Sequence, residues 1–524
     1  MLETKEKENI MKSYANCMDK LSEEDLYIGL LEYGFFAEQL PPIFSAKSFR
    51  EFCDSEKDIE YTRRKFGYIT FDTMRNTGVP RRLGIPNPIA YYHLCKCLKE
   101  CWKDIKQHLK KCTNTHEYKV SQLHIRKFAK SHCIYRHSYI DKDYESVSKE
   151  DFLIDAQYVV HTDISACFSS IYTHSLCWAL VGKSVAKEKK NESEEYYNKI
   201  DKWCRYIKGG ETQGILIGPH ASQLLSEIIL VAVDKELKKW KYFRYIDDYE
   251  CYVRSQEEAN LFIQELHQAL SHFNLSINRQ KTVVEGAPIL PNNDWKNQLL
   301  MYPLIGSLGK VTDCMIRYPR AVGFLDYSVS IMKKFNMDVA VLKYAIKVLF
   351  NRDNLTRYAR KKCSKKILHL AKVYPYLIRI LDEVVMSRES VTKNEMKCFS
   401  DSIYKDGILT GNYEQVCYAL YYALKYSFKL ENITSSDLLE SNDCILKILG
   451  WAYYKKNRDN SEVEKFSKKA VEFSMVETEM ERNWLFVYEV LNEDQLKDYW
   501  KKLKKKHVTF LNEDFIDICR ETPV

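Results

Sequence analysis

The sequence predicts an α+β fold in its first part, followed by an all-α region. Between about residues 61 and 300, runs rich in aromatic and β-branched residues are broken by Gly, Pro and Asn, a pattern typical of strands. Beyond about residue 330 such runs nearly vanish, and apolar residues recur at spacings of three and four, as in "DVAVLKYAIKVLF". The predicted architecture is therefore α+β first and all-α second.

Composition and charge limit the class of protein to which the chain can belong. The 524 residues are 45% hydrophobic and 29% charged, as in folded globular proteins, and a formal net charge of +8 permits a polyanionic partner without establishing one. The N-terminus lacks the apolar core of a signal peptide, and runs such as "IILVAV" are too short to span a bilayer. The 17 scattered cysteines indicate reduced thiols, so we expect a cytoplasmic protein without a membrane partner.

The expected elements follow in a definite order along the chain. Residues 1–60 mix short apolar patches with charge and predict a small helical segment. Strands are expected at "FGYITF", "YVVHTDISACF", "YFRYIDDYECYV" and "LSINRQKTVV", and a helix at "SQLLSEIILVAVDKELKKW". The charged start of 183–206 predicts a solvent-exposed insertion. Two loosely similar segments, "ALYYALKYSFKLEN" and "ILGWAYYKKNRDN", indicate stacked helical pairs.

Three aspartates stand where predicted strands end. Asp163 follows an alternating strand, and Asp247 and Asp248 separate two strand-like runs. Taken alone, Asp163 could cap a following helix, and two acids at a hairpin tip could be turn residues. On one sheet surface, however, the three carboxylates would repel one another, and Mg²⁺ ions would relieve that repulsion. Two such ions can activate a 3′-hydroxyl and stabilise a leaving pyrophosphate.

The motifs around these aspartates resemble those of reverse transcriptases. "YIDD" at 245–248 is similar to the Tyr-x-Asp-Asp motif of that family, and "DISACF" at 163–168 to the motif of its first aspartate. "RRLGIPNP" at 81–88 resembles the fingers motif in which an arginine precedes Ile-Pro, and Arg82 is assigned to the arginine position. "LIGPHAS" at 216–222 takes the place of the Pro-Gln-Gly-x-x-x-Ser motif, and "INRQKT" at 277–282 resembles the Asn-x-x-Lys-Thr motif.

The order of these motifs along the chain is that of the family. The resemblance implies a right-hand polymerase, reverse transcriptase-like, with fingers and palm followed by an all-α helical-repeat C-terminal domain. The expected domains are an N-terminal helical segment over 1–60, fingers and palm over 61–325, and a helical thumb and helical-repeat domain over 326–524.

The resemblance also implies roles for single residues. Asp163, Asp247 and Asp248 would be the catalytic residues and the ligands of a two-metal Mg²⁺ site, with Mn²⁺ as a substitute ion. The residues expected to bind the nucleotide are Arg82, Phe168, Gly218, Ser222 and Lys281.

Each nucleotide-binding residue has an implied task and a plainer alternative. Phe168 would be the steric gate that clashes with a 2′-hydroxyl, or else a core aromatic at a strand end. Arg82, helped by Arg75 or Arg81, would reach the triphosphate with its planar fork, or else be a surface charge. Lys281 would stabilise or protonate the departing pyrophosphate, or else be a solvated lysine.

The remaining positions of these motifs indicate a particular branch of the family. Gly218 would allow a close backbone approach to the nucleotide or primer–template. Ile217 stands where the family usually has Gln, Gln223 replaces the following Pro, and Glu227 stands where Asn is common. The pattern "IGP…S…SEI", with "IPNP" upstream, resembles the abortive-infection and defence-associated branch of bacterial reverse transcriptases, which join the polymerase to C-terminal helical repeats. That branch implies antiphage function, with protein priming, untemplated synthesis or a dedicated noncoding RNA template.

The predicted function is an RNA-directed DNA polymerase acting in antiphage defence in the bacterial cytoplasm. Its expected partners are dNTPs and nucleic acid, namely an RNA template or noncoding RNA and a DNA product; whether it forms a homo-oligomer stays open. Two alternatives also stay open: a conventional RNA-templated reverse transcriptase of retron or intron type, and a noncatalytic RNA-binding scaffold.

Overall fold

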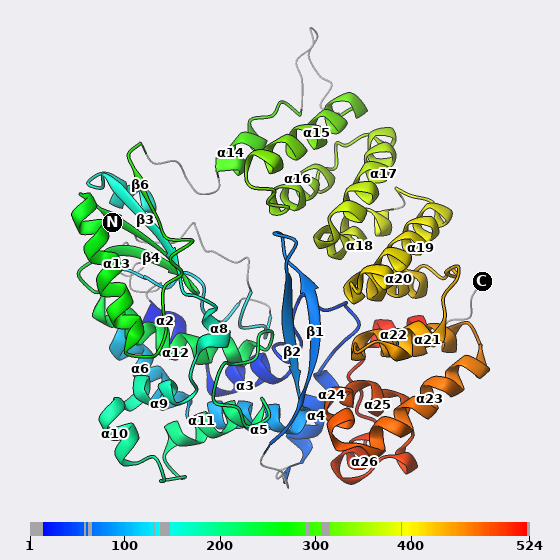
Figure 1. The fold of residues 1–524 in the computed structure, drawn as a ribbon, viewed down its shortest axis with the longest axis horizontal. Helices are drawn as coiled ribbons and strands as arrows, with labels where there is room; N and C mark the ends of the chain where they lie inside the picture. Colours follow the sequence, from blue (N-terminus) through cyan, green and yellow to red (C-terminus); the bar gives the residue numbers. More distant parts are fainter. Residues whose placement is uncertain are drawn as a thin grey trace.

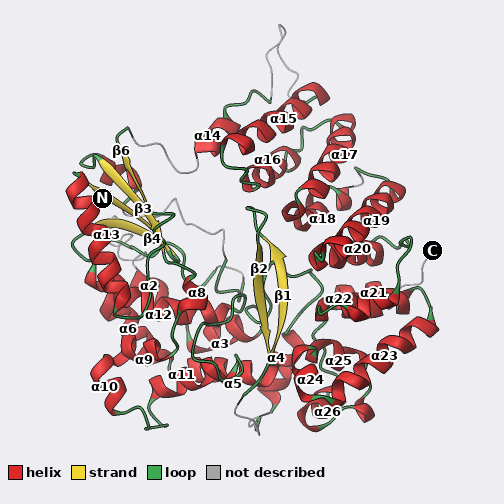
Figure 2. Ribbon diagram, in the orientation of Figure 1, coloured by secondary structure: helices red, strands yellow, loops and turns green. Residues whose placement is uncertain are grey.

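The computed structural model describes residues 14–56, 59–60, 65–128, 131–136, 147–288, 294–304, 315–388 and 390–520. Figure 1 shows a part with small sheets and helices at the left and centre, and a succession of helices that curves from the top down the right side. The described residues form two sheets, a two-stranded hairpin and a four-stranded antiparallel sheet (Figure 2). The predicted order, α+β first and all-α second, is confirmed.

The first part of the chain is helical up to a β-hairpin. The predicted helical segment 1–60 contains three helices where it is described, and its first thirteen residues lie outside the described residues. The hairpin pairs Asp72 with Arg82 and Thr73 with Arg81 across its strands. The next helix starts at Pro88, where the Asn87 side chain accepts hydrogen bonds from the Ile89 and Ala90 N–H groups. The elements are α2 (Tyr14–Asp19), α3 (Glu23–Leu31), α4 (Lys47–Ser55), β1 (Tyr68–Met74), β2 (Pro80–Pro86), α5 (Pro88–Glu100), α6 (Trp102–Thr113) and α7 (Lys149–Leu153).

The four-stranded sheet carries the predicted aspartates. Its strand order is β4-β5-β3-β6, and every neighbouring pair is antiparallel. Helix α13 packs against β3 and β5, and α12 packs against α13. The elements are β3 (Tyr158–Asp163), α8 (Cys167–Ser170), α9 (His174–Val181), α10 (Lys183–Glu188), α11 (Tyr196–Tyr206), α12 (His220–Glu236), β4 (Lys241–Tyr245), β5 (Asp248–Val253), α13 (Gln256–Ser271), β6 (Val283–Gly286) and α14 (Asp294–Leu300).

Two local expectations differ from the structure. The strand predicted at "LSINRQKTVV" begins only at Val283, because the Asn278 carbonyl and side chain accept hydrogen bonds from Lys281 and Gln280 and turn the chain just before it. The charged start of 183–206 is exposed as expected but forms helix α10, in which only Ala186 is buried.

The second part consists of helices packed in succession. Contacts run from α15 to α16 and α17, from α17 to α19, from α19 to α20, and on through α22 to α23 and α25. Its elements are α15 (Tyr318–Lys334), α16 (Ala340–Phe350), α17 (Arg357–Val373), the 3₁₀ segment η2 (Pro375–Ile380), α18 (Leu381–Val384), α19 (Lys393–Thr410), α20 (Tyr413–Lys425), α21 (Ser435–Glu440), α22 (Cys444–Lys456), α23 (Asn460–Met475), α24 (Glu477–Arg482), α25 (Trp484–Val490), α26 (Asp498–Lys505) and α27 (Glu513–Arg520).

The end of the helical succession returns to the start of the chain. The Ser45 N–H donates to the Phe510 carbonyl at 2.9 Å, and the Asn512 N–H donates to the Ile43 carbonyl at 2.9 Å. Phe510 also packs its ring against Phe35 and Phe49. The helices therefore close an arch whose lower end rests on the N-terminal helices (Figure 1).

The β1–β2 hairpin is braced by this arch. The buried Glu414 carboxylate on α20 accepts hydrogen bonds from Thr73 Oγ1 at 3.0 Å and from the Met74 N–H at 2.7 Å. Arg379 of η2 pairs with Glu414 at 2.6 Å and also donates to the Met74 carbonyl. At the hairpin tip, Asn76 Nδ2 donates to Asp338 Oδ1 at 2.7 Å.

One cluster of buried apolar residues runs from the N-terminal helices through the four-stranded sheet to the last helices. The domain divisions near 60 and 325 stay predictions. In the part of the chain that the structure describes, no helix combines the length and the apolar character needed to cross a bilayer.

Candidate active site

Strand β3 delivers Asp163 to the end of the four-stranded sheet. Val160 on this strand is fully buried, and Asp163 at its end is 7% exposed. The chain beyond is held tightly, because the Ile164 N–H donates to the Asp247 carbonyl at 3.1 Å and the Asn278 N–H donates to the Asp163 carbonyl at 2.8 Å. The helix that follows starts at Cys167, so Asp163 is not its N-cap.

The β4–β5 hairpin presents Asp247 and Asp248 beside Asp163. Tyr245 pairs with Asp248 across the hairpin, so Ile246 and Asp247 form a two-residue turn. Asp248 in turn pairs with Asp163 of the neighbouring strand. Ile246 has a φ of 62°, a left-handed conformation that is strained for a β-branched residue. The structure thus brings the three predicted aspartates together at one end of the sheet.

The pKa values of the two turn aspartates are raised in this site. Burial raises the pKa of Asp247, and the nearby Asp163 raises it further. Burial, Asp247 and Asp163 together raise the pKa of Asp248 to about 6. Opposing this repulsion, Lys281 Nζ donates to Asp163 Oδ2 at 2.5 Å and lowers the pKa of both turn aspartates. The acids therefore carry negative charge that Arg81 and Lys281 only partly offset.

The residues fit a divalent cation, although their present arrangement is not a closed ligand cage. Among the described residues, no three His, Cys, Asp or Glu side chains are arranged so that they could hold a metal ion as they stand. Asp163 Oδ1 is nevertheless buried without a hydrogen-bond partner, and the adjacent carboxylates have raised pKa values. A hard cation would satisfy that oxygen and relieve the repulsion. Asp163, Asp247 and Asp248 are the residues that would hold it.

The predicted nucleotide-binding residues differ in how far they are buried or packed against the protein's own chain. Phe168 is partly buried against the core, and its carbonyl accepts a hydrogen bond from the Ile215 N–H at 2.8 Å. Gly218 has a φ of 128°, and a Cβ there would lie 3.3 Å from Ala37 Cβ and 3.5 Å from the Gly84 carbonyl oxygen. The close approach at Gly218 is therefore to the protein's own chain. Ser222 is fully buried in α12, so in this conformation a nucleotide would not reach its hydroxyl.

The arginines of the hairpin differ in their partners. Arg82 makes a bidentate ion pair with Asp72, with both N–O distances at 3.0 Å. Arg81 lowers the pKa of Asp247 and therefore lies near the acidic turn. Counting back from Ile85-Pro86, the spacing Arg-x-x-x-Ile-Pro is met by Arg81 and not by Arg82, which is one residue too close. Arg75 donates from Nε to the Val79 carbonyl within the hairpin tip.

We expect Arg81→Ala to raise the KM for dNTP by about tenfold or more, and Arg82→Ala to raise it less. The physical reason is that Arg81 lies near the turn, whereas Arg82 is already paired with a carboxylate, and one charge-assisted contact is worth roughly 1.5–3 kcal/mol. Steady-state dNTP incorporation by the two matched variants measures the difference. A larger effect at Arg82 would mean that its pair with Asp72 opens when the nucleotide binds.

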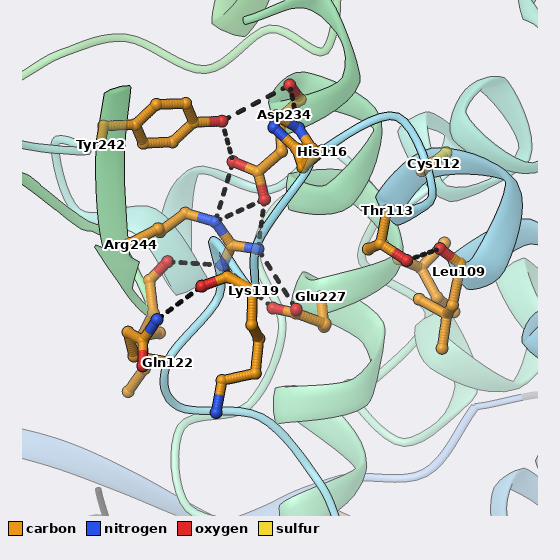
Figure 3. A network of polar contacts seen from close by, with 12 residues as sticks. Leu109, Cys112, Thr113, His116, Lys119, Gln122, Glu227, Asp234, Tyr242 and Arg244 are labelled. Atoms are coloured by element: carbon orange, nitrogen blue, oxygen red, sulfur yellow. Dashed lines mark hydrogen bonds and ion pairs between the residues drawn. The ribbon is translucent and has the colours of Figure 1, made fainter. Parts of the chain in front are cut away.

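A buried arginine adjacent to the turn was not expected from the sequence. Arg244 on β4 is 0% exposed, and its guanidinium donates to Glu227 at 3.0 Å and to Asp234 at 2.7 Å (Figure 3). Its Nη1 also donates to the Ile246 carbonyl at 2.9 Å, which fastens the strained residue before Asp247. Burial lowers the pKa of Arg244, but Asp234 and Glu227 outweigh it and the pKa is raised. Arg244 therefore ties the acidic turn to α12.

The surroundings of this arginine complete its hydrogen bonding. The Tyr242 hydroxyl donates to Asp234 Oδ1 at 3.0 Å, and the Arg244 N–H donates to the Val120 carbonyl at 3.0 Å. Glu227 had stood out in the sequence only as a departure from the Asn common in the family. The structure gives that departure a reason, because a carboxylate at this position pairs with Arg244.

Comparison with known proteins agrees with this geometry. Residues 89–297 match the family described as reverse transcriptase (RNA-dependent DNA polymerase). No curated protein sequence matches the chain. The chain therefore contains a reverse transcriptase domain, and Asp163, Asp247, Asp248 and Lys281 lie within it.

Solved structures with detectable similarity include two telomerases in complex with the TWJ fragment of telomeric RNA. The Candida albicans telomerase is 12% identical with a TM-score of 0.28, and the match covers 65% of this chain and 62% of that chain. The Candida tropicalis telomerase is 14% identical with a TM-score of 0.25, covering 68% and 65% respectively. The chain thus spans less than two thirds of the length of these proteins.

Proposed function

We propose that the reverse transcriptase domain makes this protein an RNA-directed DNA polymerase that transfers nucleotides from dNTPs by two-metal chemistry. The observation that carries the proposal is the meeting of Asp163 with Asp247 and Asp248 at one end of the sheet, with Asp163 Oδ1 left without a hydrogen-bond partner. Bound Mg²⁺ would supply activation of the 3′-hydroxyl and charge stabilisation of the pyrophosphate.

The chain's own residues have separate tasks in this proposal. The three aspartates hold the cations, and Arg244 fixes the turn that carries two of them. Lys281, now paired with Asp163, exchanges that partner for the developing charge of the pyrophosphate and can donate a proton there. Arg81 and Arg82 pair with the triphosphate. Phe168 blocks a 2′-hydroxyl and so favours dNTP over NTP.

Purified protein with labelled dNTPs tests the proposal directly. We expect incorporation with Mg²⁺ or Mn²⁺, its loss with EDTA, and at least tenfold lower incorporation of NTPs at equal concentration. The EDTA effect should reverse when Mg²⁺ is restored, because the ions act on the reaction and the apolar core holds the fold without them. Absence of any incorporation over a range of RNA, DNA and template-free conditions would refute the polymerase assignment.

The fate of the product separates the modes of synthesis. A labelled product that stays in the phenol phase until protease digestion indicates priming from a side chain. A product complementary to a copurifying structured RNA indicates a dedicated noncoding template. Efficient copying of any supplied primed RNA indicates the conventional retron-like or intron-like alternative. Ile217 in place of Gln favours the unconventional modes, because a polar contact near the nucleotide is missing.

We further propose that this synthesis serves antiphage defence in the bacterial cytoplasm. Support comes from the "IGP…S…SEI" pattern at Ile217–Ile228, which resembles the defence-associated branch, and from the helices that follow the palm. Cells that express the protein should plate phage less efficiently than cells that carry an empty vector. Equal plating across a diverse phage panel would contradict the defence role and leave the polymerase proposal untouched.

A further inference from the structure

Helix α17 carries an unusual concentration of positive charge. Its sequence, RYARKKCSKKILHLAKV, contains no acidic residue. The N-terminal half holds Arg357, Arg360, Lys361 and Lys362, where the helix dipole makes positive charge unfavourable. The helix dipole therefore gives no reason for these residues.

Only part of this charge is neutralised by neighbours. Lys365 pairs with Glu395 at 2.5 Å, Lys366 pairs with Asp326, and Lys372 pairs with Asp406 at 3.4 Å. Arg357, Lys361 and Lys362 are all exposed, and no carboxylate of the described residues lies within ion-pair distance of them. Burial lowers the pKa of Arg360, Arg388 lowers it further, and Asp353 opposes them.

An aromatic side chain lies among these cations. Tyr358 is 60% exposed, and Lys362 Nζ lies 5.6 Å from the centre of its ring. Tyr318 at the start of α15 packs edge-on against it, with ring centres 5.7 Å apart. An exposed ring flanked by cations is the combination that binds single-stranded nucleic acid, since bases stack on the ring and phosphates pair with the cations.

The residues are held on a firm support. The Ile316 N–H donates to the Asn354 carbonyl at 2.8 Å, and the Thr356 N–H donates to the Ile316 carbonyl at 3.1 Å. These bonds join the start of α15 to the start of α17. Figure 1 shows the two helices at the upper right, across the arch from the sheet that carries the aspartates.

We propose that the exposed face formed by Arg357, Tyr358, Lys361 and Lys362, together with Tyr318, binds the backbone and bases of a single-stranded polynucleotide. The identity of the polymer rests on the proposed function, which gives the protein a nucleic acid to handle; the charge and the exposed ring do not depend on it. The face lies apart from the four-stranded sheet that carries the aspartates (Figure 1). RNA and single-stranded DNA share this chemistry, so the test compares both.

The test neutralises the face and compares it with a matched helix. The variant Arg357→Gln/Lys361→Gln/Lys362→Gln removes three charges with little change in helix propensity. The control Lys465→Gln/Lys468→Gln/Lys469→Gln on α23 removes three lysines that already pair with Glu462, Glu464 and Glu472. Binding of fluorescent 20-nucleotide RNA and DNA strands is followed by anisotropy over a range of KCl concentrations.

At 0.1 M KCl we expect the α17 variant to bind the strand at least about tenfold more weakly than the unaltered protein. The slope of log K against log [KCl] should be smaller in magnitude by about 2, because each single-strand phosphate contact contributes about 0.7. The control should bind within twofold of the unaltered protein. Tyr358→Ala should weaken binding about fivefold or more, whereas Tyr358→Phe keeps the ring and should not. The polymer, RNA or DNA, whose binding affinity falls more in the α17 variant is identified as the ligand.

Two results would overturn the proposal. In the first, the α17 variant binds the oligonucleotide no more weakly than the α23 control does. In the second, poly-glutamate of equal charge displaces the bound oligonucleotide as effectively as unlabelled strand does. The second would assign the face to acidic protein. A melting temperature like that of the unaltered protein shows that each variant keeps the fold. Because binding is measured without dNTPs, failure of the polymerase assay would refute the proposed function and leave this inference standing.

Discussion

Replacement of both turn aspartates, Asp247→Asn/Asp248→Asn, is expected to lower dNTP incorporation by on the order of 10³-fold or more. The carboxylates are the proposed cation ligands, and losing several kcal/mol of transition-state stabilisation costs tenfold in rate for each 1.4 kcal/mol. Asparagine keeps the size of each side chain, so the hairpin register can persist. The measurement is single-nucleotide incorporation with Mg²⁺ and with Mn²⁺.

The same variant should be at least as thermally stable as the unaltered protein without metal. The pKa of Asp248 is raised to about 6 by burial, Asp247 and Asp163, so its ionised form destabilises the folded state. That destabilisation is absent well below the unfolded pKa near 4, grows as pH rises to about 6, and is fully present at pH 7. Removing the charge should therefore raise the melting temperature at pH 7 and have little effect at pH 3.5.

A nearby aspartate provides the matched control. Asp155 is exposed and pairs with Arg254 near the other end of β5, so Asp155→Asn should leave incorporation within twofold. If the Asp247→Asn/Asp248→Asn variant both incorporates dNTPs and protects cells from phage, the enzymatic hypothesis is wrong. Protection without incorporation would favour the noncatalytic RNA-binding scaffold.

Replacement of the buried arginine, Arg244→Met, is expected to lower the free energy of unfolding by about 3–5 kcal/mol. Arg244 lies between Glu227 and Asp234, and its loss would leave two buried carboxylates without a cation. Methionine fills most of the volume of the arginine stem, so the cost comes mainly from charge. Urea unfolding followed by circular dichroism measures the change.

A compensating variant tests the cause of that loss. Arg244→Met/Glu227→Gln/Asp234→Asn removes the arginine and both charges, and we expect it to recover at least half of the lost stability. Arg244→Lys keeps one positive charge but cannot reach both carboxylates and the Ile246 carbonyl together, so it should be intermediate. Equal stability of the single and triple variants would contradict the electrostatic explanation.

The sequence predicted the acidic site better than the buried residues that hold the site in place. The hairpin at "YFRYIDDYECYV" and the strand before Asp163 are local patterns, in which aromatic and β-branched residues flank a two-residue turn, and both are confirmed. The Arg244 network was not predictable in the same way. Glu227 stood out only as a departure from Asn, Asp234 did not stand out at all, and a fully buried arginine runs against the usual exposure of that residue.

The assignments at the β1–β2 hairpin show a similar limit. The motif spacing favours Arg81, whereas the pair between Arg82 and Asp72 depends on strand register, which the sequence alone does not show. Gly218 was expected to approach the nucleotide or primer–template, which stays a prediction, and its close neighbour in the structure is Ala37 from a distant part of the chain. Such contacts require the tertiary fold, which local patterns do not determine.

Closure of the arch limits how the helical part can change in length. Open solenoids tolerate the gain or loss of a repeat, because each repeat touches only its neighbours. Here the helices meet the first half of the chain at separate points, at Asn76 through Asp338, at Thr73 through Glu414, and at Ser45 through Phe510. An inserted or deleted helical pair would shift at least one of these junctions out of register. We therefore expect length variation among natural variants to be confined to the loops between helices.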